Sequence, residues 1–541
     1  MEARHLPARP SLEHYKKQAK DFVKNFKSAD LDAIQRTRNS HTHADNFLNS
    51  ASLKAKFALA DAQLIIAREH GFESWPRFAK HIQSLTRRVS FESLETAVAA
   101  FIEAACVPVN ASHGSGTLED AEAIRAANPE IDRASVYAAA ILGDDAAVRR
   151  FLALDARNGT AKGGPRNWDA LTYLCFSRYL RLDHAKSQGF VRTATALLDA
   201  GADANAGFYE KNHQPEPEFE SVLYGAAGIA HHVELTRLLL SRGADANDGE
   251  VVYHTPESYD NAALKLLVES GRVTPDSLAT MLLRKHDLHD YEGVTWLLQH
   301  GADPNRVTRW NRTALQHAAL RDNSLQIFKA LLDHGADPTL PQNKSSVATA
   351  ARRGRGDLLD LFLRRGFAVE LHGVDRLVAA CATNDRATID EIVTRAPECV
   401  NELHAKGGKL LSDFAGVGNT EGVRCLLDLA VEVNARYPDN DLYWDVSKDS
   451  TALHTACWRA RHATAKLLIS RGAQVNALDG KGRTPLSLAV RACVDSYWTH
   501  LRSPESVKAL LEAGASAEDV SFPSGYTEVD ELLRQYAKND R

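Results

Sequence analysis

The sequence predicts an all-α protein built as a solenoid of repeated helical pairs. A short pattern of two apolar residues, two residues of any kind and a glycine recurs along most of the 541-residue chain. Its spacing averages about 36 residues, which is typical of repeat architectures. The composition, 44% apolar and 25% charged, indicates a folded chain. One compact core is excluded by length, because single cores stop growing near roughly 250–300 residues.

The repeat occurs in eleven copies. Eight copies keep the glycine and lie at 197–201, 239–243, 267–271, 297–301, 331–335, 362–366, 468–472 and 510–514. Weaker copies keep the apolar pair without the glycine and lie at 151–155, 392–396 and 426–430.

Each copy is expected to be a turn, a short helix, a second turn and a longer helix. The longer helix buries the apolar pair and ends at glycine, which adopts a left-handed conformation without a steric penalty. Asp and Asn follow in segments such as 301–305, because their side chains favour turns. Thr313, Ser345, Thr451 and Thr484 are suited to cap the next helix. A single unit cannot bury its own apolar faces, so neighbouring units must stack.

Three of these helix starts resemble the signature of the ankyrin-repeat family, T-P-L-H-x-A with a period near 33 residues. The segment 451–456 reads TALHTA, 484–489 reads TPLSLA, and 313–318 reads TALQHA. The match covers about 130–520. The resemblance implies an ankyrin α-solenoid of about eleven helix-turn-helix units. It also implies a non-enzymatic protein that binds other proteins through the concave face and the turn loops.

The ends of the chain do not carry the repeat. Apolar residues in 12–26 share one helix face, which indicates a small helical N-terminal domain. The segment 59–78 resembles N-terminal segments that precede ankyrin arrays in some bacterial proteins. We therefore expect an N-terminal helical domain at 1–90, a helical connector and capping half-repeat at 91–133, the array at 134–520 and a C-terminal capping helix at 521–541.

Composition and motifs narrow the function classes. A formal charge of −5 gives no electrostatic argument for nucleic acid, and no run of 18 apolar residues indicates a membrane span. Seven cysteines are scattered without paired spacing, and the N-terminus lacks a secretory apolar segment. We expect a cytoplasmic protein without cofactor or resident metal, since phosphate-loop and zinc motifs are missing. The partner's identity and the oligomeric state stay open.

The informative departures from the repeat are insertions. Several intervals exceed the period by roughly ten residues, and the added segments are rich in aromatic and charged residues. Tyr, Trp and Arg are the types enriched in binding hot spots. The candidate partner-binding residues are Trp168, Arg178, Tyr209, Tyr253, Tyr259, Trp310, Tyr443 and Trp444.

Other interpretations stay open beside this one. The inserted loops could cover each other instead of a partner. A metal-binding or catalytic composite site within 163–311 would use His213, His254, His286 and His289 with nearby carboxylates. A nucleic-acid surface would use Arg352, Arg353, Arg355, Arg364 and Arg365.

Overall fold

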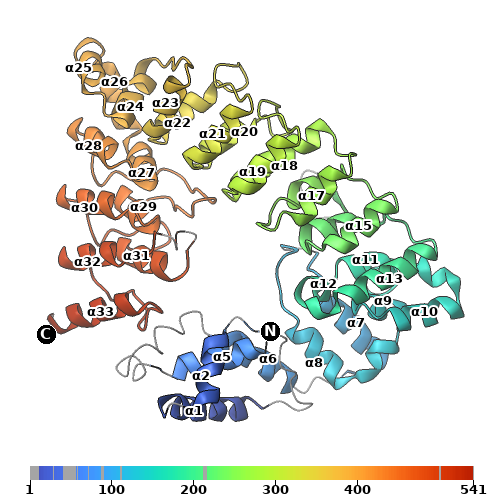
Figure 1. Ribbon diagram of the computed structural model, residues 1–541. Coiled ribbons are helices and arrows are strands. Elements are labelled where there is room, and N and C mark those ends of the chain that lie inside the picture. The colour runs from blue at the N-terminus through green and yellow to red at the C-terminus, as the bar shows by residue number, and fades with distance from the viewer. Residues whose placement is uncertain are drawn as a thin grey trace. The chain divides into compact units, whose positions relative to one another are not determined.

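The computed structural model divides into two compact units, residues 1–273 and 274–541. It describes residues 11–28, 30–40, 57, 59–70, 72, 74–86, 91–109, 112–210, 216–496, 498 and 501–539. The described part is mostly helical (Figure 1), as the sequence predicts.

The first unit contains α1 (Leu12–Lys27), α2 (Leu31–Ser40), α5 (Leu59–Glu69), α6 (Trp75–Thr86), α7 (Leu94–Ala105), α8 (Glu119–Ala127), η1 (Pro129–Arg133), α9 (Val136–Ile141), α10 (Asp145–Leu154), η2 (Ala156–Gly159), α11 (Ala170–Cys175), α12 (Arg178–Leu182), η3 (His184–Lys186), α13 (Ser187–Asp199), β1 (Gly207–Glu210), β2 (Glu218–Ser221), α14 (Val222–Tyr224), η4 (Gly225–Ile229), α15 (Val233–Ser241), α16 (Gly249–His254) and α17 (Ala262–Glu269).

The second unit contains α18 (Pro275–Asp287), α19 (Tyr291–Gln299), α20 (Ala314–Leu320), α21 (Leu325–Asp333), α22 (Ser345–Arg352), α23 (Gly356–Arg364), α24 (Gly373–Thr383), α25 (Arg386–Arg395), α26 (Glu398–Ala405), α27 (Gly407–Val417), α28 (Thr420–Asp428), α29 (Ala452–Trp458), α30 (His462–Ser470), α31 (Pro485–Val494), α32 (Glu505–Glu512) and α33 (Thr527–Asn539).

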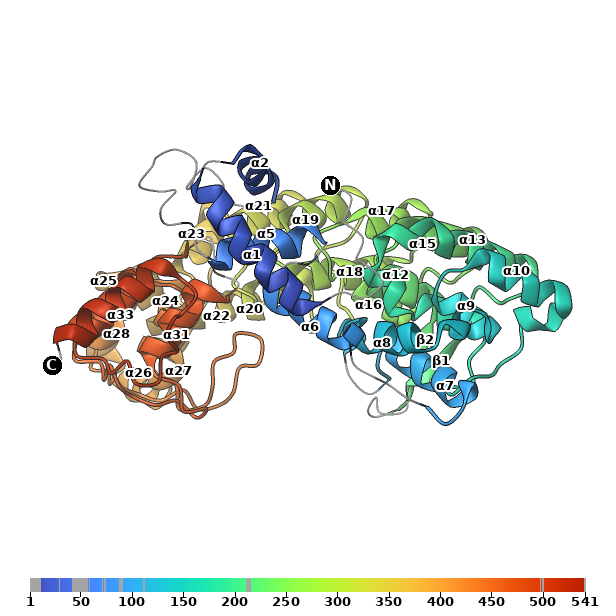
Figure 2. The ribbon, with the colours of Figure 1, turned by 90° about the horizontal axis from the view of Figure 1, so that it is seen from below.

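Helices within each unit stack in two rows. In the first unit α10, α13, α15 and α17 pack in sequence, and α9, α11, α14 and α16 form the second row. Figure 2 shows α10, α13, α15 and α17 following one edge of this unit. In the second unit α18, α20 and α22 form one row, as do α27, α29 and α31. The stacking of helical pairs predicted from the repeat is therefore confirmed within both units.

The glycines that end the repeats adopt the conformation that the pattern predicts. Gly301 has φ +90°, and open space surrounds the position where a Cβ would stand, so the backbone angle and not crowding selects glycine. The same positive φ occurs at Gly201, Gly243, Gly271, Gly335, Gly366, Gly472 and Gly514.

In seven of the copies that keep the glycine, the first apolar residue of the pair anchors the turn that follows it. Leu297 is fully buried, and its carbonyl accepts a hydrogen bond of 3.1 Å from the backbone N–H of Ala302. A bond across five residues closes the helix end in the Schellman manner. The same bond is accepted by Leu197, Leu239, Leu331, Phe362, Leu468 and Leu510.

Asparagine ties consecutive turns together, a role beyond the turn preference that the sequence suggests. The amide nitrogen of Asn305 donates to the carbonyl of Gly335 (2.8 Å), and its oxygen accepts from the N–H of Asp337 (3.0 Å). The equivalent pair of bonds is made by Asn205, Asn434 and Asn476. Each of these side chains fixes the spacing between its own turn and the next.

The predicted helix caps are confirmed at two positions and wrong at one. Thr313 and Thr484 accept hydrogen bonds from the third residue of their helices and form capping boxes. Thr451 also precedes its helix, where its backbone N–H bonds His454 at 3.1 Å. Ser345 is instead the first residue of α22, because the preceding Lys344 already has helical angles.

A β-hairpin interrupts the helical pattern in the first unit, where the sequence predicts only a loop. Strands β1 and β2 pair antiparallel, with Phe208 opposite Glu220 and Tyr209 opposite Phe219. The approach is close at Gly207, where a Cβ would lie 2.1 Å from the Glu220 carbonyl oxygen. The hairpin turns Phe208 and Glu220 inward and leaves Tyr209 exposed.

The N-terminal helices share a core of their own. Tyr15, Ala19, Phe22 and Phe26 of α1 are buried together with Phe57 and residues of α5 and α6, as the helix face in 12–26 predicts. The limits of the four expected parts, 1–90, 91–133, 134–520 and 521–541, stay predictions.

An ion network is buried between the helices of the second unit. Asp322 accepts hydrogen bonds from Arg353 (Nε, 2.9 Å) and Arg459 (Nη1, 2.9 Å), and Arg353 also donates to Asp413 at 3.0 Å. All four side chains are at least nine-tenths buried. The inserted loop covers this network, because the Trp444 ring lies 3.8 Å from the Arg459 guanidinium. The Asp322 carboxylate therefore links the ends of α22 and α29, and the loop that carries Trp444 packs on this link.

Replacement of Asp322 tests this dependence. We expect Asp322→Ala to lower the free energy of unfolding by about 3–5 kcal/mol, since it removes the carboxylate that pairs the buried guanidinium of Arg459 and leaves Arg353 with Asp413 alone. Asp333→Ala is the matched control, because it breaks an exposed pair with Arg365 and should change stability little. Urea denaturation followed by tryptophan fluorescence measures both. Equal losses in the two variants would show that the buried network carries no special weight.

Candidate functional site

The first unit contains a pocket of about 870 Å³ between its turns and inserted segments. The lining residues are Ser112, His113, Gly114, Arg181, Glu210, Glu220, Tyr224, Gly228, Ile229, Ala230, His231, Glu250, Tyr253, His254 and Glu257. Carboxyl groups outnumber cationic groups in this set, which makes the pocket acidic.

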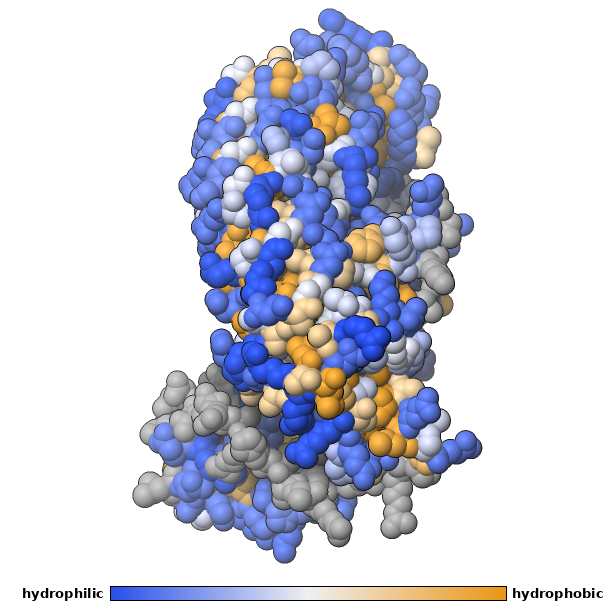
Figure 3. Space-filling view, turned by 90° about the vertical axis from the view of Figure 1, so that its right-hand side faces the viewer, coloured by the Kyte–Doolittle hydropathy of each residue, from blue (hydrophilic) through white to orange (hydrophobic). Residues whose placement is uncertain are grey.

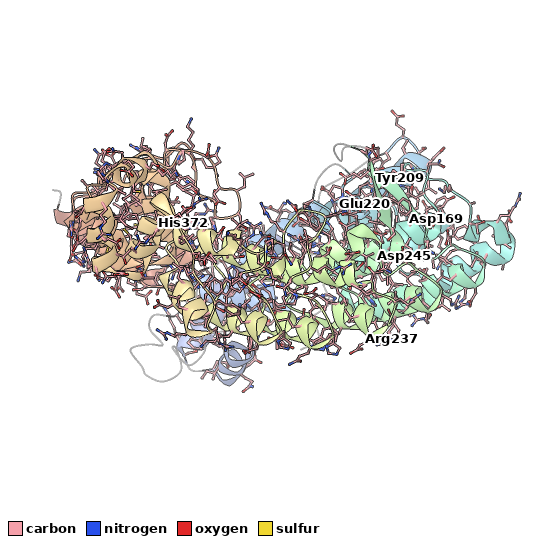
Figure 4. The ribbon with its side chains drawn as sticks, turned by 90° about the horizontal axis from the view of Figure 1, so that it is seen from above. Asp169, Tyr209, Glu220, Arg237, Asp245 and His372 are labelled. Carbon is pink, nitrogen blue, oxygen red and sulfur yellow. The ribbon has the colours of Figure 1, made fainter. Side chains whose placement is uncertain are left out.

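Separate elements bring the acidic groups together. The hairpin supplies Glu210 from β1 and Glu220 from β2, and α16 supplies Glu250 and His254. Figure 4 shows Glu220 and Tyr209 on the hairpin. The segment before α8 contributes His113 from the other side. These groups are far apart in the sequence and meet only because the turns are stacked.

Glu220 is the most unusual group in the pocket. It is 2% exposed and lies opposite Phe208, whose ring stacks on Trp168 at 4.2 Å. Burial, together with the nearby carboxylates of Glu250 and Glu210, raises the pKa of Glu220 to about 9. At neutral pH this carboxyl group therefore keeps its proton.

The pKa values of two histidines in the pocket, His254 and His113, are shifted in opposite directions. His254 donates to Glu250 (3.1 Å) and to Glu257 (2.7 Å). Burial opposes its charge, but the two carboxylates outweigh burial and raise the pKa of His254 to about 9. Burial lowers the pKa of His113 to about 4, and its Nδ1 shares a hydrogen bond of 2.9 Å with the Tyr224 hydroxyl. At neutral pH His254 is therefore a cation and His113 is neutral.

Several of the aromatic residues proposed from the sequence are exposed. Tyr209 and Tyr259 are 63% and 72% exposed, and Tyr253 lines the pocket. Trp310, in the second unit, is 37% exposed beneath the guanidinium of Arg309. On the face shown in Figure 3, apolar side chains are interrupted by hydrophilic ones.

The other proposed residues are held inside the chain by their own contacts. Trp168 is buried against Phe208, and Arg178 donates to the carbonyl of Ala104 at 2.7 Å. Both side chains are therefore packed against the chain itself, Trp168 from a loop and Arg178 from the start of α12.

Tyr443 and Trp444 are also turned inward. The Tyr443 hydroxyl donates to the carbonyl of Asp287 at 2.8 Å, and the Arg321 guanidinium lies 3.8 Å from its ring. Trp444 is buried on Arg459. These rings cover the ion network of the second unit, which explains why this insertion is aromatic.

The histidines of the composite-site alternative occupy different surroundings. His254 lies in the pocket of the first unit, whereas His286 is in the last turn of α18 in the second unit and His289 follows that helix. His286 is fully buried and donates to the Leu282 carbonyl at 2.6 Å. Among the described residues, no three His, Cys, Asp or Glu are placed to hold a metal ion. His213 lies outside the described residues.

The arginines of the nucleic-acid alternative face carboxylates. Their partners are Asp375 for Arg352, Asp322 and Asp413 for Arg353, Asp357 for Arg355, Asp360 for Arg364 and Asp333 for Arg365. This pairing removes the local positive charge on which that interpretation depended.

Sequence reasoning missed the acidic residues of the pocket. Glu210, Glu220 and Glu250 stand in charged segments that resemble ordinary solvated turns. The residues of 207–221 gave no signal for them, because in the E-F-E segment at 218–220 the buried residue is Glu220, whereas Phe219 is only partly buried.

Comparisons with known proteins agree with this architecture. Residues 280–372 and 413–521 match the family model of ankyrin repeats in three copies. These two segments are therefore similar to ankyrin repeats. Among the described residues, no helix is long and apolar enough to cross a membrane.

The individual relatives have low sequence identity to this chain or match only a small part of it. The ankyrin repeat and KH domain-containing protein mask-1 of Caenorhabditis elegans is 25% identical over 307 residues, covering 53% of this chain and 11% of that protein. A putative ankyrin repeat protein of Rickettsia bellii (strain RML369-C) is 32% identical over 133 residues, covering 21% of this chain and 52% of that protein. The chain thus spans about a tenth and about half of their lengths. The human ASB11 ankyrin repeat domain is 18% identical with a TM-score of 0.22, covering 47% of this chain and 96% of that one.

The buried carboxyl group makes a prediction about stability and pH. Above pH 4.5 the unfolded chain releases the Glu220 proton, while the folded chain retains it up to about pH 9. The folded state therefore loses stability as pH rises through this window, by at most about 1.4 kcal/mol per pH unit. Glu220→Gln carries no such penalty. We expect its gain in thermal stability to be larger at pH 8 than at pH 5. An equal shift at both pH values would contradict the retained proton.

Proposed function

We propose that this chain is a non-enzymatic interaction protein that binds a segment of a protein partner at the turns of its first unit. The observation that carries the proposal is the pocket, together with the exposed tyrosines of the two inserted segments that form part of its wall. Tyr253 lines the pocket. Tyr209, on the hairpin face opposite to Glu210, and Tyr259 are the exposed tyrosines of these segments.

The exposed tyrosine rings of the first unit are suited to contact a partner. Tyrosine presents a large rigid surface with a polar end, and it is enriched where partners bind. Tyr209 stands on a hairpin, and a ring that points to water there gains little from folding. Cover by a partner would bury that ring. Trp310, which is 37% exposed, is proposed as a separate partner contact of the second unit.

The test is partner capture with tyrosine variants of the full chain. We expect the double variant Tyr209→Ala/Tyr259→Ala to bind proteins captured by the wild-type chain at least about tenfold more weakly, since both rings are exposed on the inserted segments of the first unit. Tyr291→Ala is the control, because this exposed tyrosine lies in the second unit.

Quantitative mass spectrometry of the captured proteins, followed by affinity measurement on each purified candidate, gives the readout. Unchanged binding by the double variant would contradict the proposed surface. Thermal unfolding of each variant shows whether the fold is retained.

A further inference from the structure

The pocket of the first unit contains buried polar atoms that the chain does not satisfy. The Oε2 atom of Glu220 and the Nε2 atom of His113 have no hydrogen-bond partner among the described residues. Both side chains are more than nine-tenths buried and line the pocket. Buried polar atoms are normally hydrogen-bonded, so each such atom calls for an explanation.

The neighbours of Glu220 cannot supply the missing donor. Phe208 and Trp168 form an apolar wall on one side. His113 approaches Glu220 only to 3.9 Å, beyond hydrogen-bonding distance, and it is neutral at neutral pH. His254 already donates from both ring nitrogens to Glu250 and Glu257.

Arg181 is the remaining cation on the wall. Its Nη2 donates to the carbonyls of Ser115 and Gly116, at 3.4 and 3.2 Å, and its Nε has no partner among the described residues. The lining therefore contains four carboxyl groups, those of Glu210, Glu220, Glu250 and Glu257, beside this one guanidinium.

We infer that this pocket receives a cationic side chain, arginine or lysine, from the segment of the protein partner bound at the first unit. The inference rests on the proposed function and names the chemistry of the residue that enters. Carboxyl oxygens of Glu220 and Glu210 would accept from the guanidinium or ammonium group, and Tyr224 and Tyr253 offer aromatic rings beside it. Arginine fits best because its planar fork can meet more than one carboxylate.

A bound cation would change the proton balance of the pocket. Glu220 is protonated in the empty pocket, facing Glu210 from β1, Glu250 and His254 from α16, and Asp248 before α16. The positive charge of the guest favours the ionised carboxylate, so binding at neutral pH releases the Glu220 proton to solvent. His254 stays protonated because Glu250 and Glu257 continue to hold it.

The experiment is isothermal titration calorimetry of the full chain with defined probes. These are the peptide acetyl-Gly-Arg-Gly-amide, the same peptide with neutral citrulline, and agmatine as a free small cation. We expect the arginine peptide to bind at least about tenfold more tightly than the citrulline peptide. Glu220→Gln should remove that preference, and its unfolding curve confirms that it is folded. Glu234→Gln, exposed on α15, should leave the preference unchanged.

The proton provides a second readout. The binding heat of the arginine peptide should change with the ionisation enthalpy of the buffer, and Glu220→Gln should lose this dependence. Equal binding of the arginine and citrulline peptides, unchanged binding by Glu220→Gln, or no heat from any probe at millimolar concentration would overturn the inference. Binding of agmatine without the arginine peptide would also overturn it, because the site would then take small amines.

The inference and the proposed function can fail separately. Partner capture that is retained by Glu220→Gln but lost in Tyr209→Ala/Tyr259→Ala would support the interaction surface. It would contradict the entry of a cationic residue into the pocket. Loss of arginine-peptide binding in Glu220→Gln, with partner capture unaffected by the tyrosine changes, would support the cationic residue in the pocket and contradict the tyrosine surface.

Discussion

Each helical pair of this chain has an apolar face that only a neighbouring pair can cover, and this constraint shapes every other feature. Fully buried residues such as Leu297 and Leu331 form the shared interface and also anchor the turns that follow them. Asparagines such as Asn305 then fix the distance from one turn to the next. Inserted segments start from these fixed turns, so the position of an insertion is set by the stack beneath it.

The same constraint accounts for both sites with buried charge. In the second unit, Asp322 is enclosed between helices and must be paired with Arg353 and Arg459. In the first unit, Asn205 joins the turn before the hairpin to the turn before α16. That link brings Glu220 close to acidic neighbours. Stacking therefore produces a buried ion network with paired charges in the second unit. In the first unit it produces a pocket in which buried polar atoms lack hydrogen-bond partners.

The fold could be predicted from the sequence because its signals are local and repeated. Gly301 with a positive φ, Leu297 in the core and the cap at Thr313 follow from propensities of a few adjacent residues. The site could not be predicted in this way. Glu220 is indistinguishable from a solvated turn residue until the hairpin places it opposite Phe208. The exposure of Tyr209 and the burial of Trp444 likewise depend on how each loop folds back, which composition does not encode.

The central claim is that stacking buries the Glu220 carboxyl group so deeply that it keeps its proton at neutral pH. Infrared spectroscopy of the full chain, compared with Glu220→Gln, tests this most directly, because a protonated carboxyl group has its own carbonyl band. We expect the wild-type chain to show this band at pH 7 and to lose it only near pH 9, with no such band in Glu220→Gln. A wild-type spectrum at pH 7 with every carboxyl group ionised would contradict the claim.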